Sequence, residues 1–240
     1  PGVLQTNRRG NDDVFVARLD PTAGAAVYVT YLGGIGSDEA YGLAVDINGA
    51  AYVTGWTNHG SFPITPGAAD PRGGGLWEGF VSKISPDGSR LEYSTFLGGN
   101  ATDWPRAIAV DARGAATVVG ATYSADFPIT AGAYDTTCGL NGACDGNEDA
   151  FVVRLNPAGT AFEYVTFIGG SDVDNAFGVA LYADYIYVTG PTWSSDFPTT
   201  SGAFDPSYGG PGEGFVAVLT QGGATLSYAS YLGGDDQDTP

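Results

Sequence analysis

Acidic side chains recur along this sequence at fixed distances from glycine and phenylalanine, in patterns that could bind a divalent cation. One set lies four residues after the second glycine of a Gly-Gly pair; this Asp38 set consists of Asp38, Asp103, Asp174 and Asp238. A second set lies two residues before a phenylalanine; this Glu78 set consists of Asp13, Glu78, Asp149 and Glu213. Carboxylate oxygens are ligands that Ca²⁺ prefers. Both sets are therefore candidate calcium ligands, with the Asp38 set first.

Two smaller acidic sets lie in loops. The Asp70 set closes a Gly-Ala-x-Asp element and consists of Asp70, Asp135 and Asp205. The Asp126 set precedes Phe-Pro and consists of Asp126 and Asp196, with Ser61 at the same place in the first copy. Aspartate also forms turns by accepting local backbone N–H groups. All four sets can therefore be metal ligands or turn formers, and the Glu78 set can also accept backbone N–H groups from an adjacent unit.

The elements that must position these acids form an internal repeat. Four stretches align a phenylalanine, namely "DVFVARL", "EGFVSKI", "DAFVVRL" and "EGFVAVL", and each is followed by a second run such as "EYSTFLGG". Three copies continue into a strand pair such as "YGLAVDINGAAYVTG" and a loop such as "DFPITAGAYD". The copies differ in length only in loops and turns. Insertions confined to loops are what a repeated supersecondary unit predicts.

Each unit holds four short strands, which predicts an all-β β-propeller built of four-stranded antiparallel blades. In the first complete unit we expect "GLAV" as the innermost strand A, followed outward by "AYVTG" as B, "GFVSKI" as C and "EYSTFLGG" as D. Other stacks of antiparallel repeats remain an alternative. About three and a half blades are present, whereas a ring needs about four to eight. We therefore expect that remaining blades of a larger propeller, or neighbouring copies, cover the ends.

The repeat also gives the boundaries of the units. They are residues 1–11 as an N-terminal extension, 12–34 as a half blade of strands C and D, 35–99 as a blade, 100–170 as a blade with an insertion in its cysteine-containing loop, 171–234 as a blade and 235–240 as the start of the next connection. In an up-and-down blade the D-to-A and B-to-C connections emerge at the same face. The acidic sets belong to these connections or to the start of strand C, so they should gather on that face. This predicts one Ca²⁺ site per blade, and no other cofactor.

The pattern "D-A-F-V-x-x-L-N…Y-x-T-x-L-G-G…D-x-A-x-G-x-A-V-D…Y-V-T-G-x-T…D-F-P-x-T-x-G-A" resembles the bacterial SBBP repeat, a β-propeller repeat of secreted and cell-surface proteins. The resemblance covers residues 12–238. It departs at Pro105 and Arg106, which replace a small-then-aromatic pair, and at Tyr182, which replaces the aspartate seen at Asp46 and Asp111. The resemblance implies a fold and an extracytoplasmic location, but no defined reaction.

The charge of the chain excludes one class of partner. The sequence has 27 acidic and 9 basic residues, a formal net charge of −18. Phosphate binding needs a basic surface, so a nucleic-acid partner is not expected. Bound cations would offset the self-repulsion of such a charge, although acidity can also serve solubility alone. No apolar run is long enough to cross a bilayer and no signal peptide is present, so we expect no membrane insertion and read the sequence as a processed or excerpted product.

The two cysteines indicate the compartment. Cys138 and Cys144 lie in "CGLNGAC", and the single histidine, His59, is far away in the sequence. A zinc site would need about four ligands, so a local disulfide is the interpretation that fits. A disulfide implies an oxidising, extracellular or cell-surface location.

Three functions remain open. The first is a non-catalytic extracellular or cell-surface propeller with a structural or adhesive role. In this hypothesis Ca²⁺ stiffens its loops, and the propeller is part of a surface assembly or filament. The second is a glycan- or protein-binding propeller that uses the face of the long B-to-C loops, with Trp56, Tyr123 and Trp193 as its aromatics. The third is a fragment of a propeller lyase or hydrolase. We expect no enzyme, because the acids repeat equally in each blade, and we expect as partners other copies or blades, surface proteins or glycans.

Overall fold

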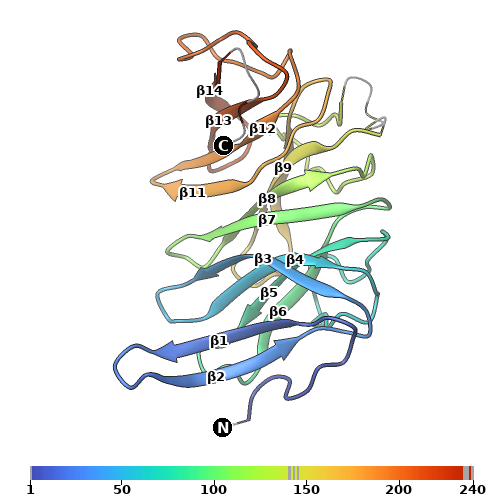
Figure 1. Ribbon diagram of the computed structural model, residues 1–240, viewed down its shortest axis with the longest axis vertical. Coiled ribbons are helices and arrows are strands. Elements are labelled where there is room, and N and C mark those ends of the chain that lie inside the picture. Colours follow the sequence, from blue (N-terminus) through green and yellow to red (C-terminus); the bar gives the residue numbers. More distant parts are fainter. Residues whose placement is uncertain (1, 140–141, 143, 145, 235–237, 239–240) are drawn as a thin grey trace.

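The computed structural model describes residues 2–139, 142, 144, 146–234 and 238. Within them the protein is all-β and contains no helix. Its strands form three four-stranded antiparallel sheets and one two-stranded sheet, which lie side by side as an open stack (Figure 1). The predicted propeller blades are confirmed in this form. The half blade lies at one end of the stack and the blade of β11 to β14 at the other.

The strands follow the predicted order. The half blade contains β1 (Val14–Asp20) and β2 (Ala25–Leu32); the first blade contains β3 (Asp38–Val45), β4 (Ala51–Thr57), β5 (Glu78–Ile84) and β6 (Leu91–Leu97); the second blade contains β7 (Asp103–Val110), β8 (Ala116–Thr122), β9 (Asp149–Leu155) and β10 (Phe162–Ile168); the third blade contains β11 (Gly178–Tyr182), β12 (Tyr185–Thr192), β13 (Glu213–Thr220) and β14 (Leu226–Leu232). In each complete blade the hydrogen-bonded order is A, B, C, D. Strand A begins earlier than predicted, because Asp38 and Asp103 already pair with strand B.

A phenylalanine of strand C lies opposite a glycine of strand B in every complete blade. The pairs are Phe80 with Gly55, Phe151 with Gly120 and Phe215 with Gly190. A methyl group on any of these glycines would overlap a carbonyl oxygen of strand A or, for Gly190, of the segment just before it. The glycine of the "YVTG" motif therefore allows strand A to approach strand B closely.

The Phe-Pro loop covers the same phenylalanine of strand C. Loop residue Phe62 stacks on Phe80 with ring centroids 4.2 Å apart. The equivalent contacts are Phe127 with Phe151 at 4.8 Å and Phe197 with Phe215 at 4.5 Å. The place of the four aligned phenylalanines in the repeat predicts that they fill the space between blades, and this prediction holds for the three that are fully buried. It is wrong for Phe15, which is 70% exposed, because no strand B and no Phe-Pro loop lie beside β1.

The second copy departs from the repeat pattern at Pro105 and Arg106, and these residues lie at a bulge in strand A. The register of β7 with β8 shifts between Pro105 and Ala107, so Arg106 has no partner in the ladder. Proline is tolerated because strand A lies at the edge of its sheet. The Arg106 guanidinium lies 5.0 Å from the Tyr41 ring and 5.7 Å from the Phe177 ring, which come from the neighbouring blades. Arginine at this position thus links three blades by cation–π contacts.

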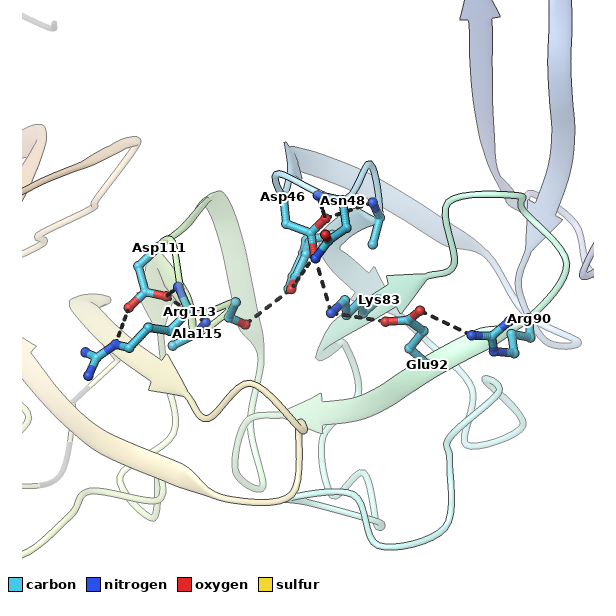
Figure 2. A network of polar contacts seen from close by, with 11 residues as sticks. Asp46, Asn48, Lys83, Arg90, Glu92, Asp111, Arg113 and Ala115 are labelled. Carbon is cyan, nitrogen blue, oxygen red and sulfur yellow. Dashed lines mark hydrogen bonds and ion pairs between the residues drawn. The ribbon is translucent and has the colours of Figure 1, made fainter.

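An ion-pair network lies in two blades, at the end opposite the Phe-Pro loops. Lys83 lies 3.4 Å from Asp46 and 3.0 Å from Glu92, as Figure 2 shows. In the second blade Arg154 takes the same place between Asp111 and Glu163, at 2.5 Å and 2.8 Å. The third blade has lost all members together, with Tyr182, Val218 and Ser227 at these positions. A buried charge without its partners is costly, so the three positions change as a group.

The contrast between Phe151 and Phe15 gives a test of the packing. We expect Phe151→Ala to lower the free energy of unfolding by about 3–5 kcal/mol, because the side chain is fully buried. The matched control Phe15→Ala should cost less than about 1 kcal/mol, because its ring is already exposed. Urea denaturation followed by tryptophan fluorescence measures both. Equal losses would contradict the open face of the half blade.

Candidate functional site

A pair of carboxyl groups lies at each crossing from one blade to the next. One acid comes from the Glu78 set, at the start of strand C, and the other from the Asp38 set, where the chain enters strand A of the following blade. The first glycine of Gly-Gly separates them. A Cβ atom on Gly33 would lie 2.6 Å from Asp38 Oδ2 and 2.8 Å from Asp13 Cγ, and Gly98 would overlap both Glu78 and Asp103. Only a residue without a side chain fits between the two acids.

Hydrogen bonds to the backbone fix the Asp38 set. Its Oδ2 atoms accept the N–H of the second glycine of Gly-Gly, at 2.8 Å for Asp38, 2.9 Å for Asp103, 2.7 Å for Asp174 and 2.6 Å for Asp238. Their own N–H groups donate to the carbonyl of the residue just before each acid of the Glu78 set, at 2.8, 2.9, 2.8 and 2.9 Å. This spacing explains why an aspartate recurs four residues after Gly-Gly.

The Glu78 set accepts N–H groups from the loop that precedes it. Glu78 Oε2 accepts the N–H groups of Gly74 and Gly75, each at 2.7 Å. Asp149 and Glu213 are bound in the same way by Gly139, and by Gly209 and Gly210. The expectation of donors from an adjacent blade is wrong. The donors belong to the same blade, because its long loop folds back over the start of strand C.

Several oxygen atoms of these pairs have no hydrogen-bond partner among the described residues although they are buried. They are Asp38 Oδ1, Glu78 Oε1, Asp174 Oδ1 and Glu213 Oε2. At the crossing between the first and second blades the equivalent oxygen, Asp103 Oδ1, accepts the Thr122 hydroxyl. Burial, the largest cause, raises the pKa of Glu78 and of Asp149 to about 7. Burial also raises the pKa of Asp103 and of Asp174 to about 6. The neighbouring carboxylate adds to the rise in Glu78 and Asp149. The Glu78–Asp103 pair and the Asp149–Asp174 pair can therefore each hold a shared proton or a cation.

The Asp70 set forms local turns, whereas the Asp126 set binds the D-to-A connection about 25 residues before it in the sequence. In the Asp70 set each Oδ1 accepts the N–H two residues later, at 2.9 Å from Arg72, 2.9 Å from Thr137 and 3.0 Å from Ser207. In the Asp126 set Asp126 accepts the N–H of Asn100 at 2.9 Å, and Asp196 that of Ser171 at 2.8 Å. Ser61 does the same for Ile35 at 2.8 Å. Across the described part of the chain, no three His, Cys, Asp or Glu side chains gather closely enough to hold a metal.

The loop-face aromatics mostly pack against other side chains. Trp56 is buried and lies edge-on to Trp77, with ring centroids 4.2 Å apart. Tyr123 lies edge-on to Trp104 and donates a 2.6 Å hydrogen bond to Glu148. Trp193 is half-buried and lies against Gly212. These contacts fix the long loops to the start of the strands.

His59 takes part in a local turn. Its Nδ1 accepts the N–H of Ser61 at 3.1 Å and lies 2.9 Å from the Ser61 hydroxyl. The Ser61 hydroxyl also accepts the N–H of Ile35. His59 stands where the later copies have Ser124 and Ser194, whose hydroxyls donate to the aspartate of the Asp38 set. His59 and Ser61 therefore occupy the positions that a serine and an aspartate take in the later copies.

Gln5 is a member of the repeat that sequence analysis missed. Its carbonyl accepts the N–H of Tyr31 at 3.0 Å, as the Asp70 carbonyl does for Phe96 at 3.1 Å. Its N–H donates to the Thr30 hydroxyl, as Asp70 does to Thr95. The signal was the match of "PGVLQ" to "PGAAD", which the glutamine obscured. Residues 2–11 thus make the contacts of the end of a B-to-C loop.

Cys138 and Cys144 form a disulfide in the inserted loop of the second blade, with their Cα atoms 4.9 Å apart. The predicted disulfide is therefore present, and disulfides persist in oxidising compartments. Among the described residues, no helix has the length and apolar character that crossing a membrane requires.

Comparison with known families supports the repeat. The model of SBBP, a beta-propeller repeat, matches residues 27–63. This segment runs from β2 through β3 and β4 into the loop that contains Ser61 and Phe62. A search of curated proteins found no match to the chain. The chain thus contains an SBBP beta-propeller repeat, as its sequence pattern indicated.

The raised pKa values predict how stability depends on pH without metal. Glu78 has a pKa of about 7 in the folded protein against an ordinary 4.5, so the folded state holds a proton that the unfolded state has released. The free energy of unfolding should therefore fall as pH rises from about 4.5 to about 7. We expect Glu78→Gln to flatten this fall, because the amide cannot ionise. Melting temperatures in EDTA between pH 4.5 and pH 8 measure the slope.

The exposed Glu39→Gln removes the same charge outside the pairs and is the control. It should keep the slope of the wild-type protein. If Glu78→Gln and wild type show the same slope, Glu78 does not retain its proton in the folded state.

Proposed function

We propose that this chain is a non-catalytic β-propeller module of an extracellular or cell-surface protein, with a structural or adhesive role in a surface assembly and with Ca²⁺ at its carboxylate pairs. The observation that carries the proposal is the recurrence of a carboxylate pair, with at least one buried member, at every blade crossing. An acid–base centre needs titratable groups in different environments at one place. Equal pairs at successive crossings instead belong to the frame of the repeat.

The unpartnered oxygens support Ca²⁺ as the ion. A buried carboxylate oxygen without a hydrogen bond is costly, and a cation would compensate it. Ca²⁺ accepts six to eight oxygens from carboxylates, backbone carbonyls and water. Each crossing offers two carboxyl groups beside a Gly-Gly segment, whose carbonyls and bound water would supply the rest. The net charge of −18 also favours cation binding.

The disulfide supports the proposed location. Small loops closed by a disulfide persist where the environment is oxidising, and they are rare in the cytosol. The Cys138–Cys144 bridge closes the one loop that carries the insertion. The SBBP match supports this location only because repeats of this type occur in secreted and cell-surface proteins. A secretion assay of the full-length protein is therefore the direct measurement.

Thermal melting at pH 8 tests the calcium proposal. We expect the melting temperature to rise when CaCl₂ replaces EDTA at constant ionic strength. At a free Ca²⁺ concentration about 100 times the dissociation constant, each site should add about 2.7 kcal/mol to the free energy of unfolding. Elemental analysis after dialysis should find bound calcium. An unchanged melt together with no bound calcium would overturn the proposal.

Two variants separate the pairs from the turn aspartates. Glu78→Gln combined with Asp103→Asn removes one pair and should reduce the bound calcium by one ion. Asp70→Asn is the control, because Asp70 forms a turn and belongs to no pair. Equal calcium contents in both variants would show that the ion lies elsewhere.

A further inference from the structure

The spacing between an acid of the Glu78 set and its backbone donors is the same in three of the four copies. The donors lie four and three residues before the acid, and they are Arg9 and Gly10 for Asp13, Gly74 and Gly75 for Glu78, and Gly209 and Gly210 for Glu213. In the second blade the donor Gly139 lies ten residues before Asp149, yet its N–H reaches the carboxylate at 2.6 Å. The same bond is therefore made across a segment that contains the whole insertion.

The disulfide removes the insertion from the path of this loop. Cys138 lies three residues after the aspartate of the Asp70 set, which is the place of Gly73 in the first blade and of Tyr208 in the third. Cys144 lies five residues before the acid of the Glu78 set, and this is again the place of Gly73 and Tyr208. The bridge brings the two Cα atoms to 4.9 Å, compared with about 3.8 Å between consecutive residues. Both cysteines thus occupy a single position of the repeat.

That position lies beside one aromatic residue of strand D in the first and third blades. The Tyr208 ring lies 5.7 Å from the Tyr231 ring, measured between centroids. A Cβ atom on Gly73 would lie 3.4 Å from the equivalent ring of Phe96. The third equivalent is Phe167, and the disulfide is buried in the same apolar cluster as this residue. In every complete blade the next residue is the glycine that donates to the acid, so a fixed position here also fixes the donor.

The bond from Gly139 is connected to the crossing into the third blade. Its acceptor Asp149 forms a carboxylate pair with Asp174, and a Cβ atom on Gly169 would lie 2.8 Å from Asp174 Oδ2 and 3.2 Å from Asp149 Oδ1. The Asp174 N–H donates to the Glu148 carbonyl at 2.8 Å, directly before Asp149. A longer open loop loses more conformational entropy when its ends are held together, and a cross-link removes that loss. The disulfide therefore favours the ordered form of this crossing.

We propose that the Cys138–Cys144 disulfide positions the carboxylate pair between the second and third blades. It closes the insertion out of the loop, so that the Gly139 N–H is held against Asp149 and the pair of Asp149 with Asp174 is kept in place. The bridge forms when the two thiols give two electrons and two protons to an oxidising disulfide, which becomes two thiols. This crossing is therefore completed only under oxidising conditions, whereas the crossing of Glu78 forms in either state.

Only one consequence of this inference rests on the proposed function. If Ca²⁺ occupies the carboxylate pairs, loss of the disulfide should remove the ion at this crossing and leave the ions at the other crossings. The positioning of Asp149 by Gly139 does not depend on calcium, because the bond is made by the backbone of the loop. Measurements in EDTA therefore test the disulfide, and measurements in CaCl₂ test its link to the ion.

The experiment compares two variants of the full chain that both lack the disulfide and both carry Cys138→Ser. The long-loop variant adds Cys144→Ser and keeps the insertion. The short-loop variant instead lacks residues 140–145, so that its loop reads Ser-Gly-Gly-Asn-Glu-Asp, with the spacing of "YGGPGE" in the third blade. Hydrogen exchange in EDTA, followed by mass spectrometry, compares residues 169–176 at this crossing with residues 98–105 at the crossing before it. We expect residues 169–176 to exchange at least about tenfold faster in the long-loop variant and at the wild-type rate in the short-loop variant.

Residues 98–105 should exchange at the same rate in all three proteins and are the internal control. Wild-type protein refolded in reduced dithiothreitol should exchange like the long-loop variant. Equal exchange of residues 169–176 in the wild type and the long-loop variant would overturn the proposal, and so would fast exchange of this segment in the short-loop variant. If the long-loop variant does not fold, a short-loop variant with the wild-type melting temperature supports the proposal, and one that also fails to fold overturns it.

Calcium content separates this inference from the proposed ion. After dialysis against CaCl₂ the long-loop variant should bind one ion fewer than the wild type, and the short-loop variant should recover that ion. Equal calcium contents in the wild type and the long-loop variant would overturn the link between the disulfide and the ion. A wild-type protein without bound calcium would overturn the proposed ion, while the exchange rates in EDTA still decide whether the disulfide positions the pair.

Discussion

A carboxylate buried at each crossing between blades is the interaction on which the stack depends. Asp103 accepts the N–H of Gly99 through its side chain, while its own N–H bonds the carbonyl of Trp77 in the preceding blade. One residue thus closes the Gly-Gly bend and joins the start of strand C to the start of the next strand A. The cost of this crossing is a buried acid that retains its proton or needs a cation.

The repeat is conserved in its geometry more strictly than in its charges. The third blade lacks the ion-pair network of Lys83 and Arg154, yet its strands keep the same order and pairing. The network lies at the end of the blade opposite the carboxylate pairs, and its members change together because a buried charge without its partners is costly. The pairs remain at every crossing. Ion pairs therefore adjust the stability of single blades, whereas the crossing sets the path of the chain.

Much of this arrangement could be read from the sequence, because a repeat converts single residues into equivalent positions. The order of strands A to D and the Gly-Gly bends followed from alignment of the copies, and the disulfide of Cys138 followed from the presence of only two, closely spaced cysteines. The exposure of Phe15 did not follow, because burial depends on which strands lie beside a residue and not on its place in the repeat. The sequence left open which groups donate to Glu78, since the path of a long glycine-rich loop has no periodic signal. Whether the carboxylate pairs bind metal depends on the positions of further oxygen ligands, which the sequence pattern does not give.

The contact of a strand-D tyrosine with a turn glycine of the next blade, as in Tyr93 with Gly159, has a consequence for how such proteins can change over generations. Gly159 belongs to the following copy of the repeat, and a side chain there would overlap the Tyr93 ring. Gly159 therefore cannot change while Tyr93 is kept, although the two are distant in the chain. Duplication of one whole copy adds a new tyrosine together with a new glycine, so the old and new neighbours fit at once. Lineages can thus lengthen or shorten the array by gene duplication and loss without any compensating substitution.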